Sequence, residues 1–447
     1  MKTRVLCTYG ATYAGGISRM LVDGLPHLSR QPGIQLAVAD LYGRESINRM
    51  FRATGMPIVH AGVNGAPYTS VRSGLARQFD RVRAVPRHVL MAHRLKQAAQ
   101  TADVLYVHTY KELALAAWSC VPPRSGARLV WHCHGLDSVS PGTAQLARMC
   151  TRIIAISETV AGRLTEIGVS RNRIATIVNA VDVERIVIAA AQPPISPLPA
   201  KGARRAVLVP TASIRETKGI HVLLDAARKV PEIAIWIAGD TQDQAAEGYA
   251  KRLRTLSQSP ELMGRVHFIG FRQDIYSVMQ AADIVCVPSV CREGFGLVAA
   301  EAMGLGKPVI VSNRGALPDV VPQGKAGIVF DPDRPQELTS ALQRLTTDSE
   351  YTQRLAAYAG PYVRLRFSYI QWSNMVAQVL REASSQPGDW SAIQARRQPC
   401  HAGLRDLRDA DANQLNKDAG STVYKAAGSD DEMTMLVAPF AERVVSG

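Results

Sequence analysis

The chain contains 447 residues, of which 47% are hydrophobic and 6% aromatic, and it carries a formal net charge of +14. This length and apolar content predict two or three domains with enough apolar side chains for two cores, and they exclude a chain that is disordered throughout. The low aromatic content and the absence of a recognised nucleic-acid motif predict that nucleic acid is not a partner.

The first residues enter a strand-like run at once and contain no signal-peptide core. No apolar run later in the chain approaches the length that crosses a membrane. We therefore expect a cytoplasmic protein. The seven cysteines form no CxxC pair, which indicates neither a disulfide framework nor a cysteine zinc site.

Strand-like runs alternate with helical stretches through the first half of the chain. The runs are RVLCTYG, IQLAVADL, DVLYVHT, RLVWHCHG, TRIIAISE and RIATIVN. This alternation predicts an α/β fold with a parallel sheet. Directly after the first run, Gly15 and Gly16 open a helix, and free backbone N–H groups at such a position are able to meet an anion.

Most of the positive charge lies in residues 1–200, which contain 23 Lys and Arg against 11 Asp and Glu. Residues 72–96 interleave apolar side chains with seven cations and one acid, Asp80. The cations are Arg72, Arg77, Arg81, Arg83, Arg87, Arg94 and Lys96. Such a segment is typical of a helix on an anionic membrane surface. A solvated helix face is the alternative, because Pro86 interrupts a single amphipathic helix.

Two histidines, His132 and His134, end the strand RLVWHCHG. The two-residue period of a strand turns both to the same side. A histidine pair lacks the third ligand that zinc chemistry requires, so we predict no metal site. A further histidine, His108, also ends a strand-like run, DVLYVH, and the sequence leaves two roles open for it, one in the core and one facing a bound substrate.

A segment rich in Pro and Ala, residues 189–199, breaks the pattern before a second series of strands begins. That series is AVLVPTAS, EIAIWIAGD, RVHFIGF, DIVCVPS and PVIVS. The break predicts an interdomain linker. Two open parallel sheets that face each other would place the carboxyl ends of their strands at a shared cleft, where α/β folds bind ligands.

Five segments follow from this reading of the chain. They are a first Rossmann-like domain at 1–185, a linker at 186–204, a second Rossmann-like domain at 205–365, a helix at 366–383 that returns to the first domain, and a polar, disordered tail at 384–447.

In the second domain, Lys218 lies at the turn between the strand AVLVPTAS and the next helix, where a cation can meet a phosphate. The run 282–289 has the composition of a buried strand, and the loop after it leads into a helix whose first N–H groups attract anions. Glu293 in the loop and Glu301 in the helix are each able to accept hydrogen bonds from vicinal hydroxyls. The pattern predicts a site for a sugar nucleotide.

This block closely resembles the donor-site signature of the retaining glycosyltransferases of the GT-B fold, family 4, also called glycosyl transferases group 1. The segments 306–312 and 315–319 resemble the continuation of that signature, although Ala316 and Asp319 stand where glycine and glutamate are commoner. The resemblance extends from about Arg4 to Glu382. It implies two facing Rossmann-like domains, with the acceptor on the first and the nucleotide sugar on the second.

The resemblance also implies roles for single residues. Glu293 would lie at the hexose and Glu301 would hold the ribose hydroxyls. Lys218 would contact the diphosphate, and His134 would face the donor sugar from the first domain, so Glu293, Lys218 and His134 form the expected catalytic set. Relatives often carry an arginine five residues before the lysine. Here that position is Ser213, and Arg215 is expected to substitute for the arginine.

The other donor-binding residues that the resemblance implies surround the diphosphate and the base. They are Gly294, Phe295, Gly296, Leu297, Gly15, Gly16, Phe271 and Arg272. The base would meet the last two largely through the main chain.

The implied reaction moves a sugar from a nucleotide diphosphate sugar, most simply a UDP- or GDP-sugar, to a hydroxyl of a glycan, polysaccharide or lipid-linked intermediate, with retention at the anomeric carbon. It needs no metal or other cofactor. We expect peripheral contact with the inner face of an anionic membrane. The alternatives are a catalytically silent GT-B-like protein that binds sugar nucleotides or acts as a scaffold, a nucleotide-sugar epimerase, and a membrane adaptor.

Overall fold

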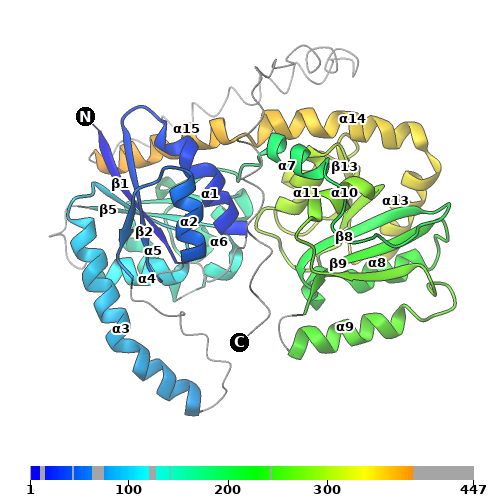
Figure 1. The fold of residues 1–447 in the computed structure, drawn as a ribbon, viewed down its shortest axis with the longest axis horizontal. Helices are drawn as coiled ribbons and strands as arrows, with labels where there is room; N and C mark the ends of the chain where they lie inside the picture. The colour runs from blue at the N-terminus through cyan, green and yellow to red at the C-terminus, as the bar shows by residue number, and fades with distance from the viewer. Residues whose placement is uncertain are drawn as a thin grey trace. The chain divides into compact units, whose positions relative to one another are not determined.

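The computed structural model describes residues 2–10, 16–42, 45–62, 75–119, 127–140, 142–241 and 244–385. Gly15 and the predicted tail from residue 386 onward lie outside these ranges. Within them, two parallel sheets form, each from one half of the chain (Figure 1). The expected fold class, two Rossmann-like domains, is confirmed. No helix in the described ranges is long and apolar enough to cross a membrane.

The first sheet has seven parallel strands in the order β3-β2-β1-β4-β5-β6-β7. They are β1 (Thr3–Tyr9), β2 (Ile34–Asp40), β3 (Ile58–His60), β4 (Val104–Val107), β5 (Arg128–Cys133), β6 (Arg152–Ala155) and β7 (Ile174–Thr176). The helices between them are α1 (Gly16–Ser29), α2 (Glu45–Ala53), α3 (Leu75–Ala99), α4 (Tyr110–Ser119), α5 (Thr143–Met149) and α6 (Glu158–Glu166), with short 3-10 turns η1 (Leu136–Ser138) and η2 (Arg171–Arg173).

The second sheet has six parallel strands in the order β10-β9-β8-β11-β12-β13. They are β8 (Arg205–Ser213), β9 (Ile233–Asp240), β10 (Val266–Gly270), β11 (Ile284–Val287), β12 (Val309–Ser312) and β13 (Gly327–Phe330). The associated helices are α7 (Val183–Ala190), η3 (Glu216–Lys218), α8 (Ile220–Ala227), α9 (Gln244–Leu256), α10 (Ile275–Ala281), α11 (Leu297–Gly304), α12 (Leu317–Val320), α13 (Pro335–Thr347) and α14 (Ser349–Arg366).

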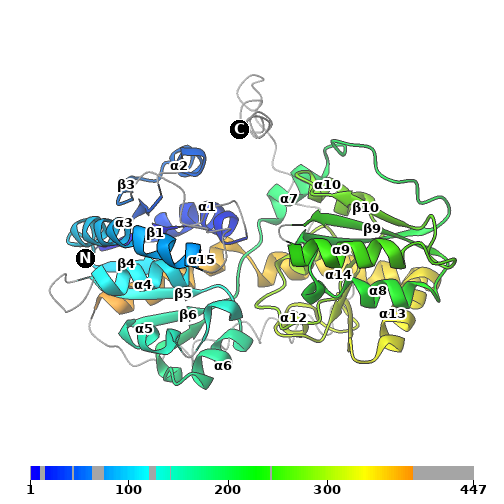
Figure 2. The ribbon, with the colours of Figure 1, turned by 90° about the horizontal axis from the view of Figure 1, so that it is seen from below.

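The apolar runs form buried strands because helices cover both faces of each sheet. In the second sheet, buried side chains of α8, α9 and α13 join those of the strands in one core. Figure 2 shows these three helices on one side of the sheet and α10 on the other.

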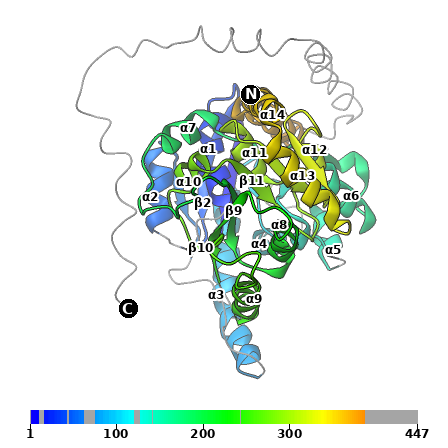
Figure 3. The same ribbon diagram turned by 90° about the vertical axis from the view of Figure 1, so that its right-hand side faces the viewer.

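Residues 72–74 of the predicted basic segment lie outside the described ranges. From Leu75 onward the segment forms one continuous helix, α3, in spite of Pro86. The expected interruption is therefore wrong. Pro86 is exposed, so water can satisfy the carbonyl group that loses its N–H partner. Figures 1 and 3 show the first turns of α3 projecting away from the first sheet.

Two helices lie near the predicted domain boundaries. The boundaries themselves stay predictions. Helix α7 extends into the segment expected to be a linker, and it packs against α10 and α11 of the second half. The last described helix, α15 (Tyr369–Ser384), contacts α1 and strands β1, β4, β5 and β6 of the first sheet. Its Trp372 is buried. A methyl group at Gly24 would come within 2.8 Å of the Trp372 ring, so only glycine allows this close approach.

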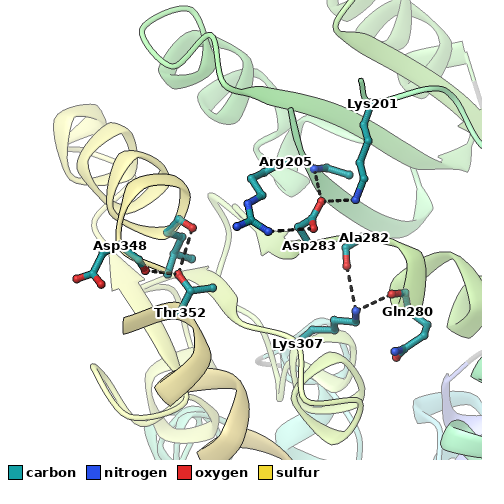
Figure 4. Close-up of polar contacts among 10 residues, drawn as sticks. Lys201, Arg205, Gln280, Ala282, Asp283, Lys307, Asp348 and Thr352 are labelled. Carbon is teal, nitrogen blue, oxygen red and sulfur yellow. Dashed lines mark hydrogen bonds and ion pairs between the residues drawn. The ribbon is translucent and has the colours of Figure 1, made fainter. Parts of the chain in front are cut away.

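The amino-terminal edge of the second sheet is fixed by Asp283, directly before β11 (Figure 4). Its carboxylate accepts from Lys201 Nζ and from the Ala206 backbone N–H, both at 2.7 Å, and it pairs with Arg205. Nearby, Lys307 Nζ donates to backbone carbonyls at the end of α10. These contacts lie at the edge of the sheet where the strands begin, opposite the edge where the strands end.

Candidate functional site

Strands β8 and β11 are parallel neighbours, so the loops that follow them meet at one edge of the sheet. The Lys218 ammonium, in the loop after β8, lies 2.8 Å from Oε1 of Glu293, in the loop after β11. Ser289 Oγ donates to the same oxygen at 2.6 Å. Both charged side chains are partly exposed, at 35% and 19%. The structure therefore brings together two of the predicted catalytic residues, which stand 75 positions apart.

Backbone geometry holds the Lys218 loop against the Glu293 loop. Gly219 has a left-handed φ of 64°, and a methyl group there would lie 1.9 Å from the carbonyl oxygen of Pro288. Only glycine combines this φ with such a close approach. Next to it, the Val290 N–H donates to the carbonyl of Thr217 at 3.0 Å.

A second glycine supports the main chain of Glu293. Gly315 forms an isolated parallel bridge with Glu293, and its φ of 68° is left-handed. A methyl group at Gly315 would lie 2.2 Å from the Glu293 carbonyl oxygen. The neighbouring Ala316 N–H donates to that oxygen at 2.9 Å. Ala316, which departs from the commoner glycine, is accommodated because its φ of −87° is ordinary for any residue.

Helix α11 begins at Leu297 directly after this loop. Its N-cap, Gly296, has a φ of 101° and supplies no side-chain cap hydrogen bond, so the first N–H groups of the helix remain available for an anion. The Phe295 side chain turns away into the core, where it is buried and packs edge-on against Phe367. Of the predicted loop residues, Phe295 is therefore able to contact a donor only through its main chain.

Glu301 lies one turn into α11 and is buried. Its Oε1 accepts from the Tyr276 hydroxyl at 2.7 Å and lies 3.6 Å from the Arg19 guanidinium. Arg19 also donates to the Tyr276 hydroxyl at 2.7 Å. Burial raises the pKa of Glu301, while Arg19 and Tyr276 oppose that rise. The sequence analysis missed Arg19 and Tyr276, because no local pattern connects α1 or α10 with Glu301.

Two close approaches join the first sheet to this loop. A methyl group at Gly294 would lie 3.3 Å from Gly135 Cα and 3.5 Å from the His134 carbonyl oxygen. A methyl group at Gly16 would lie 3.7 Å from the Leu297 side chain. The end of β5 and the start of α1 therefore both lie beside the start of α11.

His134 is part of a cluster of three histidines at the ends of β4 and β5. Its Nε2 lies 3.1 Å from His108 Nδ1, and its ring stacks on that of His132 with centroids 4.1 Å apart. Burial lowers the pKa of all three, that of His134 to about 3. All three imidazoles are consequently neutral near pH 7. The sequence analysis described two of them as a pair and missed that His108 completes the group.

Three further residues were predicted to bind the donor, and their side chains make other contacts or are exposed. Arg215 is exposed and its Nε donates to Ser213 Oγ at 3.2 Å. The Phe271 ring is 62% exposed. Arg272 forms a buried ion pair with Asp274 at 2.6 Å and donates to a carbonyl in the segment after α7. The Arg272 guanidinium therefore contacts that segment. Only the main chain of Arg272 is left to contact a nucleotide base.

A buried carboxylate that the sequence analysis missed organises the edge of the first sheet. Glu112 in α4 accepts from Thr8 Oγ1 at 2.6 Å and from the backbone N–H groups of Gly10 and His108, both at 2.9 Å. Burial raises its pKa, and these hydrogen bonds oppose the rise. The sequence contains the capping pattern Thr109-x-x-Glu112, but that pattern predicts only the start of a helix and not the contacts with Thr8 and Gly10.

Comparisons with known proteins cover both halves of the chain. Residues 15–185 match the family described as Glycosyltransferase Family 4, and residues 198–360 match Glycosyl transferases group 1. A D-inositol 3-phosphate glycosyltransferase of Corynebacterium urealyticum is 30% identical over 236 residues, 49% of this chain and 54% of that protein. A protein of Escherichia coli named for colanic acid biosynthesis, WcaL, is 28% identical over 223 residues, 48% of this chain and 53% of that protein. The chain spans about half the length of the curated relatives it matches.

The fold is similar to solved structures over most of the described chain. The crystal structure of Anabaena HepE in complex with UDP and glucose superposes with a TM-score of 0.67 at 22% identity, covering 85% of this chain and all of that one. This likeness agrees with the two parallel sheets and with the two family matches. The chain belongs to the GT-B glycosyltransferases of family 4.

Proposed function

We propose that the chain transfers a sugar from a nucleotide diphosphate sugar to a hydroxyl acceptor, with retention of configuration at the anomeric carbon. The observation that carries the proposal is the contact of Lys218 with Glu293 beside the start of α11. A cation and a helix amino terminus match the diphosphate of the donor, and a carboxylate matches the hydroxyls of its hexose.

Lys218 and α11 are the groups we assign to the leaving diphosphate. Negative charge develops there as the glycosidic bond breaks, and a positioned ammonium and a helix amino terminus stabilise it. When the donor binds, Lys218 moves its contact from Glu293 to a phosphate oxygen. Glu293 is then free to accept hydrogen bonds from the hexose and to oppose the positive charge that develops on the ring.

We assign His134 to the opposite wall of the sugar site and Glu301 to the ribose. The contacts of Glu301 with Tyr276 and with Arg19 both involve Oε1, so Oε2 is the acceptor proposed for the ribose hydroxyls. In this assignment Tyr276 and Arg19 orient the carboxylate. The reaction requires no metal or other cofactor.

A UDP-sugar is the first donor to test, because the structure of HepE contains UDP and glucose; GDP-sugars come second. The acceptor we propose is a glycan or a lipid-linked intermediate. Two of the relatives are named for an inositol phosphate and for colanic acid biosynthesis, and these names agree with a polyhydroxylated acceptor.

We also propose that α3 contacts the inner face of an anionic membrane. Arg87, Arg94 and Lys96 are exposed on this helix together with Val89 and Leu90, at 47% and 41%. Cations interleaved with apolar side chains favour such surfaces. The test is flotation with vesicles containing phosphatidylserine. The triple reversal R87E/R94E/K96E should abolish binding, and binding that persists at the level of the native chain would remove the proposal.

Transfer itself is tested with the full chain, a panel of UDP- and GDP-sugars and simple glycan acceptors, with the anomeric configuration of the product read by NMR. Lys218→Met should lower kcat by about 10²- to 10³-fold, because it removes transition-state stabilisation, with a smaller effect on KM. Lys229→Met, which changes an exposed lysine of the same half, is the matched control. Native turnover in Lys218→Met, or an inverted product, would contradict the proposal.

A further inference from the structure

The three-histidine cluster supplies the third ligand that the His132 and His134 pair lacked. Strands β4 and β5 are parallel neighbours, which brings His108 beside both. In the part of the chain that the structure describes, one nitrogen from each ring falls in a group whose members all lie within 4.8 Å of one another. Two of these side chains are buried and His134 is half-buried, so the cluster is reached from the carboxyl edge of the sheet.

His132 offers a second, independent observation. Its Nδ1 is 2.6 Å from the Tyr106 hydroxyl, whereas its Nε2 is buried and has no hydrogen-bond partner. A buried polar atom without a partner is destabilising, because it has lost its hydrogen bonds to water. Because Nδ1 is already engaged, Nε2 is the nitrogen left to bind a ligand in the cluster.

We propose that His108, His132 and His134 bind a first-row transition-metal ion, for which Zn²⁺ is the best match. Zn²⁺ takes neutral imidazole nitrogens at about 2.0–2.1 Å, which puts pairs of ligand nitrogens roughly 3.3 Å apart in a tetrahedron. The 3.1 Å between His108 Nδ1 and His134 Nε2 already matches this spacing. Three protein ligands leave a fourth position for water or for a substrate hydroxyl.

The nitrogens that would not bind the metal already have partners. His108 Nε2 lies 3.2 Å from Cys7 Sγ, and His132 Nδ1 contacts Tyr106. Metal-binding histidines usually donate their other N–H to such an outer group, which fixes the tautomer and the ring orientation. The first sheet therefore holds two of the three rings in the orientation that a metal requires.

Metal binding would oppose transfer rather than support it. His134 is the side chain proposed to face the donor sugar. A metal ion bound to its Nε2 would prevent that nitrogen from contacting the sugar. We therefore expect Zn²⁺ to inhibit reversibly. This consequence rests on the proposed function, whereas the metal site itself does not.

The site is tested on the full, metal-stripped chain by titration with Co²⁺, followed by its visible ligand-field absorption, and then by competition with Zn²⁺. We expect one equivalent to bind. His132→Asn keeps an atom for Tyr106 and removes Nε2, and His108→Gln keeps an atom for Cys7 and removes Nδ1. Both should lose the tetrahedral spectrum. Tyr106→Phe should weaken binding by about 10- to 100-fold, and the exposed His93→Asn should bind as the native chain does.

Absence of stoichiometric binding, or equal binding in the native chain and in both cluster variants, would overturn the metal site. Circular dichroism shows whether each variant is folded, and the two cluster variants serve as independent tests. The inhibitory role is tested by the ratio of transfer rates with and without Zn²⁺, and by recovery with a chelator. Equal transfer rates with and without Zn²⁺, in a chain that binds the metal, would overturn the inhibitory role. If the chain has no transferase activity, Co²⁺ absorption still measures metal binding.

Discussion

Glu112 joins the ends of two neighbouring strands of the first sheet with one buried carboxylate. Thr8 lies in β1 and Gly10 follows it, His108 follows β4, and all three residues donate to the carboxylate. The contact fixes the backbone on which one member of the histidine cluster stands. A single buried acid therefore determines where the strand ends lie.

Glu112→Gln tests this role with almost no change in shape. The amide keeps one acceptor oxygen and places an NH₂ group against a backbone N–H, so we expect a loss of about 1–3 kcal/mol in the free energy of unfolding. Urea unfolding measures the change. Glu350→Gln, at a side chain that is 82% exposed, should be neutral. Equal midpoints for the two variants would show that Glu112 does not have this role.

At the residue scale, local motifs predicted that Lys218 lies in a turn after one strand and Glu293 in a loop after another. Parallel pairing of β8 and β11 explains why the structure brings the two into contact. No local motif predicts Arg19, because it comes from a distant helix. The directions of the Phe295 and Arg272 side chains could not be predicted either, because packing and an ion pair, which leave no local signature, decide where they point.

The turn from β8 into α8 is the element that positions Lys218. Its shape depends on Gly219, which has a left-handed φ and lies against Pro288. The sequence contains the glycine, but the close approach of Gly219 to Pro288 depends on the tertiary structure. Helix α3 differs from its prediction in another way. Pro86 predicted an interruption, but the helix is continuous, and Pro86 is exposed to solvent.

A comparison of Gly219→Ala with Gly202→Ala separates the energetic cost of backbone strain from the cost of a steric clash with a neighbouring residue. Both glycines have a left-handed φ, of 64° and 58°, but a methyl group at Gly202 meets nothing within 4 Å. Gly202→Ala should cost about 1–2 kcal/mol of unfolding free energy. Gly219→Ala should cost at least about 2 kcal/mol more, because the Pro288 backbone must move, and it should also lower turnover. Equal costs in denaturant melts would refute this account of the turn.

At the scale of the whole molecule, the alternation of strands and helices was enough to predict two parallel sheets, because the period and length of apolar runs determine this architecture. The return of the chain to the first sheet through α15 depends on Trp372 packing over Gly24. A returning helix was expected at 366–383, but the contact between Trp372 and Gly24 spans almost the whole sequence, so no local pattern predicts which residues meet.

The stability of the molecule should depend on pH through the buried histidines. Burial lowers the pKa of His132 well below its ordinary value. As the pH falls through about 6.5, the unfolded chain binds a proton at this residue and the folded chain does not, so the free energy of unfolding falls. In the presence of a chelator, this loss should be steeper in the native chain than in His132→Asn, by up to about 1.4 kcal/mol per pH unit. Parallel stability curves between pH 7 and pH 5 would contradict the prediction. Groups that do not interact with His132 cancel in the comparison.

The most direct test of the sugar-nucleotide site is thermal stabilisation of the purified chain by a panel of UDP-, GDP-, ADP- and TDP-sugars. We predict that one nucleotide class stabilises the native chain and the Glu350→Ala control alike, by about 2.7 kcal/mol at a ligand concentration of 100 Kd. The same ligand should have no effect on Glu301→Ala, which lacks the ribose acceptor. Equal stabilisation of Glu301→Ala, or no stabilisation by any donor, would contradict the assignment of the donor to this edge of the second sheet.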